Sequence, residues 1–324
     1  LPLKINITPG GVKSMRILGL QGSPRKKGNT FDLWSMFAKE AGKYGAQMET
    51  ILPHTLDINP CKELVVCEKK GFCPIKDEMD SVYAALKTAD IIVLASPVFF
   101  YNVPAQLKAL IDRCQMFWAR KYRLYLKDPN ADNRQGLLLS CGGSGGKNQF
   151  EGLELTAKIF FDALSARYQG ALTFRHVESP GDMAAHPTAK EQIRETVKKL
   201  CQPFAAKPQI LFVSAKDAFW GQMAAAFLRF HGKGRIMASS AGWSPAGDLD
   251  SRVVSLMAKK NLDLKYLKPK PLDNLVLDQH FDIVVYLDKN EHRRQISADR
   301  AIVWEMNHPS QISWDELERT RDDL

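Results

Sequence analysis

The sequence predicts an α/β protein with two doubly wound parallel sheets, one after the other along the chain. Short apolar runs alternate with segments of helical length, which is typical of parallel strands joined by helices. The alternation stops at a stretch that contains two prolines, 202–208, and then starts again. The length of 324 residues also suits two domains.

In the first part of the chain we expect five strands and five helices in alternation. Continuous apolar runs predict strands that are buried on both faces of a sheet. The expected strands are 15–20, 48–52, 91–95, 136–140 and 171–177. The expected helices, chosen by amphipathic spacing, are 31–43, 79–88, 104–118, 151–168 and 188–201. Such a sheet binds ligands at the carboxyl ends of its strands.

The second part of the chain repeats this plan without repeating the sequence. The expected elements are strand 209–213, loop 214–221, helix 222–230, strand 235–238, helix 251–260, strands 283–287 and 301–303, and a final helix from Trp314. The expected domains are therefore 1–201, with 1–14 as an N-terminal extension, and 209–324, joined by the linker 202–208.

The composition is that of an ordinary globular protein, with 45% apolar and 25% charged residues. No apolar run approaches the ~18 residues that span a membrane, and residues 1–14 lack the apolar core of a secretion signal. We therefore expect a cytoplasmic protein without a membrane partner. The net charge of +9 indicates either a solvated lysine-rich surface or attraction to a phosphate-bearing cofactor. Because no concentrated basic run is present, nucleic acid is not an expected partner.

A loop with several phosphate-binding groups, 22–30, follows the first expected strand and opens the first helix. A helix N-terminus offers free backbone N–H groups and the positive end of the helix dipole. Arg25 and two lysines add positive charge, and Ser23, Asn29 and Thr30 add short hydrogen-bonding side chains. The loop therefore predicts a phosphate site.

Two further loops follow strands of the same sheet. Loop 96–104 carries three consecutive aromatic residues, and loop 141–146 carries four glycines. A flat cofactor needs apolar surface beside its face and backbone hydrogen bonds along its rim. The aromatic loop supplies the first, and the glycine loop lets the backbone approach closely. For the aromatic residues, packing in the core is the alternative interpretation.

Through these loops, the segment from about 15 to 181 resembles the NAD(P)H-dependent FMN reductase group of flavodoxin-like proteins, especially its iron–sulfur flavoprotein branch. The matching stretches are GSPRKKGNT, ASPVFFYNVPAQLKALIDR and SCGGSGG followed by FEGLEL. The resemblance implies FMN, with NAD(P)H as co-substrate, a small-molecule or protein electron acceptor, and a homodimer or homotetramer. We expect no catalytic acid or base, because the flavin carries the redox chemistry.

The resemblance also implies which residues contact the cofactor. The phosphate contacts are Ser23, Arg25, Asn29 and Thr30. The isoalloxazine contacts are Pro97, Val98, Phe99, Phe100, Asn102, Cys141, Gly142 and Gly143. Family members usually have a small residue where this chain has Tyr101, so we expect narrower access to the flavin.

Three clustered cysteines, Cys61, Cys67 and Cys73, raise the question of a metal site. The iron–sulfur flavoproteins hold a [4Fe–4S] cluster with the run C-x2-C-x2-C-x5-C, and here the second cysteine is replaced by Leu64. Because a cubane takes four thiolates, we do not expect a cluster. Free cysteines in an ordered loop, or zinc with a fourth ligand from elsewhere, are the alternatives.

Residues 209–324 resemble the low-molecular-weight protein tyrosine phosphatases and related arsenate reductases. The matching stretches are QILFVSAKDAFWGQMAAAFL, SSAGWSPAG and HFDIVVYLD. The reacting positions differ: Ser214 replaces the nucleophilic cysteine, Trp220 the arginine, and Asp217 an asparagine, while the Asp-Pro pair reads His308-Pro309. A serine is not lowered to an anion in such a loop, and tryptophan carries no charge. We therefore expect neither phosphatase nor arsenate reductase activity.

These features predict an FMN-dependent oxidoreductase or electron carrier. One alternative is an iron–sulfur flavoprotein that transfers single electrons, and another is a flavin-based redox sensor or binding module without turnover. The second domain is then a module for docking, capping or oligomerisation. Phe219 and Trp220 would suit an interface if exposed, and would otherwise plug the vacated loop.

Overall fold

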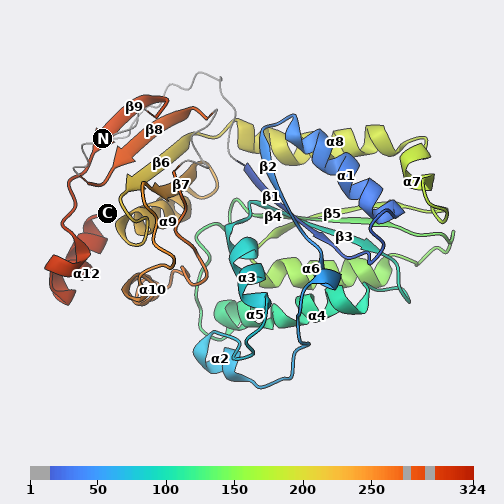
Figure 1. The fold of residues 1–324 in the computed structure, drawn as a ribbon, viewed down its shortest axis with the longest axis horizontal. Helices are drawn as coiled ribbons and strands as arrows, with labels where there is room; N and C mark the ends of the chain where they lie inside the picture. The colour runs from blue at the N-terminus through green and yellow to red at the C-terminus, as the bar shows by residue number, and fades with distance from the viewer. Residues whose placement is uncertain (1–14, 273–278, 289–295) are drawn as a thin grey trace. The chain divides into compact units, whose positions relative to one another are not determined.

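The computed structural model describes residues 15–272, 279–288 and 296–324, and the expected extension 1–14 lies outside these ranges. The described chain forms two compact units, and each is built on a parallel sheet (Figure 1). Met15–Lys127 and Ala131–Gln202 form the first unit, and Pro203–Leu324 belongs to the second. The predicted fold class is therefore confirmed. Within these ranges, we find no helix with the length and apolarity to cross a membrane.

The first unit has a five-stranded sheet in the order β2-β1-β3-β4-β5, with all neighbours parallel. Its strands are β1 (Met15–Gln21), β2 (Ala46–Ile51), β3 (Ile91–Pro97), β4 (Gln135–Cys141) and β5 (Arg167–Phe174). Because the strand order reverses after β1, a crevice forms where the carboxyl ends of β1 and β3 diverge. The three predicted loops all leave this edge of the sheet.

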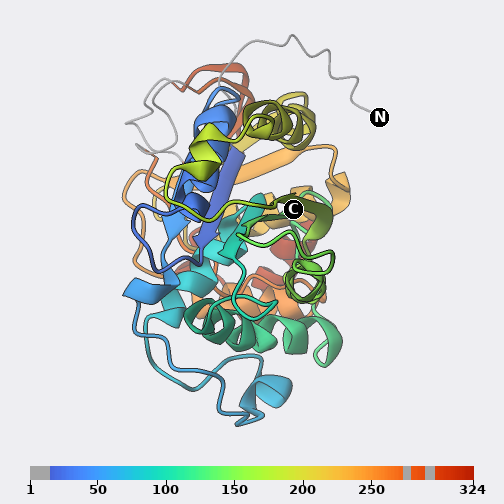
Figure 2. The same cartoon turned by 90° about the vertical axis from the view of Figure 1, so that its right-hand side faces the viewer.

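Helices cover both faces of this sheet. Figures 1 and 2 show α1 and α8 on one face and α3 to α6 on the other. The helices are α1 (Asn29–Gly42), α2 (Val66–Lys70), α3 (Met79–Thr88), α4 (Ala105–Arg113), α5 (Gln115–Tyr122), α6 (Glu151–Ala163), α7 (Asp182–Ala185) and α8 (Ala189–Ala205), with a 3-10 turn η1 (Pro53–Thr55). The central strands β3 and β4 are buried almost throughout, which explains their continuous apolar sequences.

The end of the expected helix 151–168 is wrong, because α6 stops at Ala163 and β5 begins at Arg167. Ser165 adopts a left-handed backbone with φ of +53°, which ends the helix. The buried guanidinium of Arg134 donates to the carbonyl of Leu164 at 2.8 Å and so satisfies a carbonyl at this end. The same side chain donates to the carbonyls of Lys87, in the last turn of α3, and of Ala89, the residue that ends this helix.

The expected helix 104–118 is two helices, α4 and α5, which meet at Cys114. The Tyr83 hydroxyl donates to the carbonyl of Arg113 at 3.1 Å. In a continuous helix that carbonyl would accept from Phe117, whose amide here donates to Cys114 at 2.9 Å. The tyrosine therefore marks the break between the helices.

Part of the expected linker is helical, because α8 continues through 202–205. Pro203 lies in its last turn, where a missing N–H removes one helical hydrogen bond. Phe204 is buried, with 1% of its surface exposed, and this burial favours the extra turn.

The second unit has a four-stranded parallel sheet in the order β7-β6-β8-β9. Its strands are β6 (Gln209–Ser214), β7 (Met237–Gly242), β8 (Phe281–Tyr286) and β9 (Ala298–Val303). Its described helices are α9 (Trp220–Gly232), α10 (Ser251–Ala258) and α12 (Trp314–Asp323), with a 3-10 turn η2 (Pro309–Gln311). The expected strand 235–238 is placed too early, because the turn that closes α9 includes Arg235, whose amide donates to Gly232.

Candidate functional site

The predicted loops of the first unit meet around one cavity of about 290 Å³ at the carboxyl ends of β1, β3 and β4. Its lining includes every predicted cofactor contact except Phe100 and Asn102. The lining residues are Ser23, Pro24, Arg25, Gly28, Asn29, Thr30, Pro97, Val98, Phe99, Cys141, Gly142, Gly143, Val177 and Glu178. Val177 and Glu178 were missed, although the fifth expected strand also ends at this edge of the sheet.

The phosphate loop presents an open helix N-terminus to this cavity. Gly28 is the N-cap of α1, and no described side chain caps the helix. The first N–H groups of a helix have no partner within it, so they remain available to an anion. Ser23 Oγ accepts from the Arg25 amide at 3.2 Å, which holds the loop as a tight turn. The Arg25 side chain is exposed and adds positive charge at the rim.

Asn29 has a structural role that the sequence did not indicate. Its Nδ2 donates to the carbonyl of Ser179 at 2.9 Å, and its Oδ1 accepts from the amide of Met183 at 3.2 Å. The side chain therefore ties the start of α1 to the loop before α7, which carries Glu178. Asn29 still lines the cavity, and its second Nδ2 hydrogen is not used by these bonds, so its phosphate contact stays a prediction.

The aromatic loop forms a tight turn between Phe99 and Asn102, whose backbones exchange hydrogen bonds at 2.8 and 2.9 Å. Its central residues, Phe100 and Tyr101, have φ of +48° and +60°, a conformation that normally favours glycine. Strained backbone of this kind is concentrated at functional sites. Phe100 is fully exposed and Tyr101 is 58% exposed, so the core-packing interpretation is wrong.

Asn102 stabilises the turn through the hydrogen bonds of its side chain. Its Oδ1 accepts from the Val103 amide at 2.8 Å and from the Thr156 hydroxyl at 3.2 Å. Helix α6 approaches so closely that a Cβ on Gly152 would lie 2.2 Å from the carbonyl oxygen of Tyr101. The turn is therefore positioned by α6, and Asn102 acts as a support rather than as part of the cavity wall.

The glycine loop forms another part of the cavity wall, next to the aromatic loop. A Cβ on Gly142 would lie 2.9 Å from Gln149 Oε1 and 3.2 Å from Val98 Cγ2. The adjoining Cys141 is buried, and burial raises the pKa of its thiol to about 11, although a contact with Thr30 lowers it in part. The thiol is protonated at neutral pH, so Cys141 serves as a wall and not as a nucleophile.

The three clustered cysteines line a different cavity, of about 770 Å³, to which α4, α5 and α6 also contribute residues. We call residues 59–77 the cysteine loop. Cys61, Cys67 and Cys73 are free thiols that line this cavity together with Leu64. Burial raises the pKa of Cys67, and the neighbouring thiols of Cys73 and Cys61 raise it further.

In the second unit, the loop between β6 and α9 is occupied by its own side chains. Ser214 Oγ accepts from the Asp217 amide at 3.1 Å. The fully buried Asp217 carboxylate accepts from Gln222 Nε2 and from the Lys270 amide, both at 2.9 Å. Burial raises the pKa of Asp217 to about 6. The amide of Ala215 donates to the carboxylate of Asp288. Carboxylates therefore lie where an oxyanion would bind.

The aromatic residues of this loop are buried and close it. Trp220 Nε1 donates to the carbonyl of Asn307 at 2.9 Å, and its ring lies 4.7 Å from that of Phe219. Phe219 and Trp220 are only 7% and 5% exposed. The interface interpretation is therefore wrong for these residues, and they plug the loop. His308 caps η2 by accepting from the Ser310 amide.

Comparison with known proteins assigns both units. Residues 15–174 match the NADPH-dependent FMN reductase family, and residues 209–322 match the low molecular weight phosphotyrosine protein phosphatase family. An iron-sulfur flavoprotein of Methanosarcina thermophila is 31% identical over 192 residues, which are 58% of this chain and 94% of that protein. The chain belongs to the iron–sulfur flavoprotein family.

Other matches cover smaller or similar shares of the chain. An iron-sulfur flavoprotein of Methanocaldococcus jannaschii is 40% identical over 99 residues, 31% of this chain and 51% of that protein. Among solved structures, an FMN-dependent NADH-azoreductase from Bacillus anthracis in complex with FMN has a TM-score of 0.44 at 15% identity, and covers 58% of this chain and 99% of its own. The Trp repressor binding protein from Bacillus subtilis has a TM-score of 0.39 at 21% identity, and covers 55% of this chain and 98% of its own.

The family implies two cofactors, FMN and a [4Fe–4S] cluster, and the residues of this flavoprotein suit only the first. FMN fits, because the open N-terminus of α1, the exposed Arg25 and the close glycine loop supply what its phosphate and flat ring need. A [4Fe–4S] cluster does not fit the residues present, because Leu64 replaces the second of the four cysteines and only three thiolates remain. Among the described residues, no three His, Cys, Asp or Glu side chains are placed to hold a metal ion.

Proposed function

We propose that this flavoprotein binds FMN in the cavity of the phosphate, aromatic and glycine loops, and acts as an NAD(P)H-dependent oxidoreductase or electron carrier. The observation that carries the proposal is the convergence of three loops, predicted separately, on one cavity at the start of α1. The match to the NADPH-dependent FMN reductase family supports the same reaction class.

The residues of this cavity would hold the cofactor by its two ends. Ser23, Arg25, Thr30 and the first amides of α1 would bind the phosphate, since they combine hydrogen-bond donors with positive charge. Pro97, Val98 and Phe99 would pack against the flavin ring, and the backbone of 141–143 would approach its polar rim. Bound FMN would supply the hydride and electron chemistry, and the protein would bind and orient it.

We further propose a small-molecule or protein electron acceptor and a homodimer or homotetramer. The turn at 99–102 supports this proposal, because Phe99, Phe100 and Tyr101 expose aromatic surface beside the cavity. Exposed aromatic groups of this kind favour contact with a second molecule. An acceptor or a second copy of the chain would cover them.

For the second unit we propose a non-catalytic role in docking, capping or oligomerisation. The support is chemical: Ser214 replaces the thiol, Trp220 replaces the cation, and the Asp217 carboxylate occupies the loop. With p-nitrophenyl phosphate, we expect no turnover by the natural chain or by Ser214→Cys, because the variant still lacks an arginine. Measurable release of p-nitrophenol by the natural chain would refute the proposal.

The oxidoreductase proposal is tested by an absorption spectrum of the purified protein with FMN, before and after anaerobic addition of NADH or NADPH. We expect a protein-bound flavin spectrum that bleaches with one of the two nicotinamides, followed by multiple turnovers when a quinone is added. Bound flavin that bleaches without turnover would favour a sensor or a carrier. A protein that takes up no FMN would rule out both.

A further inference from the structure

The larger cavity of about 770 Å³ lies between the cysteine loop and helices α4, α5 and α6. Ligand pockets for small organic molecules typically enclose about 300–1,000 Å³ and have mainly apolar walls. This cavity has that size and four separate walls. Nothing in the proposed FMN site uses it, because the two cavities have no lining residue in common.

The walls of this cavity are predominantly apolar. Leu64 and Val65 come from the cysteine loop, Ile111 from α4, Trp118 from α5, and Leu155 and Ile159 from α6. Several of these side chains face solvent, with Leu64 52%, Leu155 63% and Ile159 69% exposed. Large apolar side chains that gather while exposed are unusual, and they mark a surface that binds something.

Two lysines and three carboxylates line this cavity, and Arg123, which pairs with Glu68 from outside the lining, balances the third carboxylate. Lys108 Nζ lies 2.7 Å from the Asp112 carboxylate, and Glu68 lies 3.5 Å from Arg123. Lys62 and Glu63 are adjacent and of opposite sign. A charged ligand would find no net complementary charge here, whereas a neutral one would lose little by leaving water.

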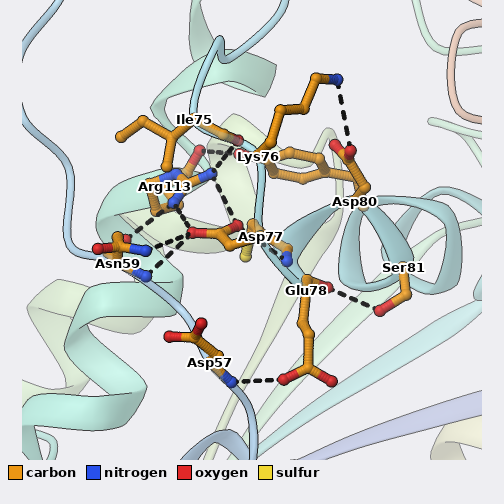
Figure 3. A network of polar contacts seen from close by, with 11 residues as sticks. Asp57, Asn59, Ile75, Lys76, Asp77, Glu78, Asp80, Ser81 and Arg113 are labelled. Carbon is orange, nitrogen blue, oxygen red and sulfur yellow. Dashed lines mark hydrogen bonds and ion pairs between the residues drawn. The ribbon is translucent and has the colours of Figure 1, made fainter.

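The cavity is also held in shape before any ligand arrives. Arg113 donates to the carbonyls of Asn59 and Ile75, so one side chain joins the two ends of the cysteine loop (Figure 3). Arg120 donates to the carbonyl of Gly71 at 2.8 Å in the middle of the loop. Because the wall is already ordered, ligand binding costs less conformational entropy.

We propose that this cavity binds a neutral, mainly apolar organic molecule, in the region where the relatives' name implies a cluster. Leu64 then has a role of its own, since it adds apolar wall where a thiolate would be needed for iron. The cysteines contribute small, polarisable wall atoms. This inference does not depend on FMN binding, and its test does not use turnover.

The test is equilibrium dialysis of the full chain, saturated with FMN, against N-phenyl-1-naphthylamine, a neutral apolar probe. We expect one bound molecule per chain. Ile159→Asp should weaken binding by about tenfold or more, because it introduces a charge into an apolar wall. The matched control is Tyr125→Asp, at a residue that is 75% exposed and does not line the cavity, and it should leave the affinity unchanged. Equal effects of the two variants would overturn the proposal.

Alkylation of the cysteines locates the probe independently of any variant. Bound probe should slow the reaction of Cys67 and Cys73 with iodoacetamide several-fold, as followed by mass spectrometry of the peptides. Unchanged alkylation under saturating probe would place the binding elsewhere and contradict the proposal. Formation of a stoichiometric iron–sulfur cluster by the natural chain, after anaerobic reconstitution with ferrous iron and sulfide, would also overturn it. So would a dimer that Ile159→Asp dissociates, because a second copy would then be the occupant.

Discussion

The Arg113 guanidinium lies 2.7 Å from the Asp77 carboxylate, and both side chains are about 1% exposed. This buried ion pair fastens the cysteine loop to α4. Burial raises the pKa of Asp77, but hydrogen bonds from Arg113 and from the amides of Asn59 and Met79 outweigh that effect, so the pKa lies below its usual value. The carboxylate is therefore charged at neutral pH, and Figure 3 shows Arg113 and Asn59 beside it.

Removal of one partner from this pair should destabilise the first unit strongly. Arg113→Ala leaves a buried carboxylate without its cation, which typically costs about 3–5 kcal/mol. Urea unfolding at pH 7 measures the change. Lys108→Ala is the control, because the Lys108–Asp112 pair has a similar distance but is more than 40% exposed, and it should change stability by less than about 1 kcal/mol. Similar losses in both variants would contradict this account of the pair.

Asp77 also predicts a pH dependence of stability. Its folded pKa is lowered, so its contribution is complete above the unfolded pKa of about 3.9 and is lost as the pH falls through the folded value. The stability difference between the natural protein and Asp77→Asn should therefore stay constant between neutral pH and about pH 5, and shrink in more acidic solution. Urea unfolding across this range measures it. A difference that grows on acidification would show the opposite sign and refute the assignment.

Asp217 predicts a dependence of opposite sign in the second unit. Its pKa in the folded chain is raised to about 6, so it favours the folded state less as the pH rises from about 3.9 through 6. Relative to the natural protein, Asp217→Asn should gain stability over this interval and keep the gain at higher pH. Thermal unfolding of both proteins at about pH 4.5 and about pH 7.5 would measure this gain, which should be larger at the higher pH. A gain that is the same at both values would mean that the carboxyl group does not titrate there.

The approach of Gly152 to Tyr101 predicts a specific effect on the cofactor. Gly152→Ala would place a Cβ 2.2 Å from the Tyr101 carbonyl oxygen, and neither backbone can yield without moving the turn that carries Phe99. We expect weaker FMN binding, by about tenfold, in a protein that is still folded. Gly42→Ala is the matched control, since nothing lies within 4 Å of its added Cβ. Flavin fluorescence titration measures both, and full affinity in Gly152→Ala would show that the turn does not touch the flavin.

The parts of the fold that follow from local sequence were predicted well. The strands of the first sheet and the loops at their carboxyl ends were recognisable because apolar runs mark buried strands, and parallel strands bring their ends together. The end of α6 could not be predicted in this way, because it depends on Arg134, which lies thirty residues before Leu164 in the chain. Elements that end through distant contacts carry no local signal.

In the site too, features that depend on local sequence were predictable, and features that depend on distant contacts were not. Most residues that line the cavity lie in the three loops that the sequence singled out, whereas Val177 and Glu178 were missed. The structural role of Asn29 depends on Ser179, 150 residues away. The left-handed backbone of Phe100 and Tyr101 was also unforeseen, because bulky residues rarely adopt it and no glycine marks the turn. The buried state of Phe219 and Trp220 was one of two possibilities that the sequence left open, and packing decided between them.

The central claim is that a phosphate binds at the N-terminus of α1, and a comparison of FMN with riboflavin tests it most directly. The two ligands share the ring and differ in the phosphate, so titration of the apoprotein with each isolates that contact. We predict that FMN binds at least about tenfold more tightly than riboflavin, since a single charge-assisted hydrogen bond contributes about 1.5–3 kcal/mol. Equal affinities, or no binding of either ligand, would contradict the account.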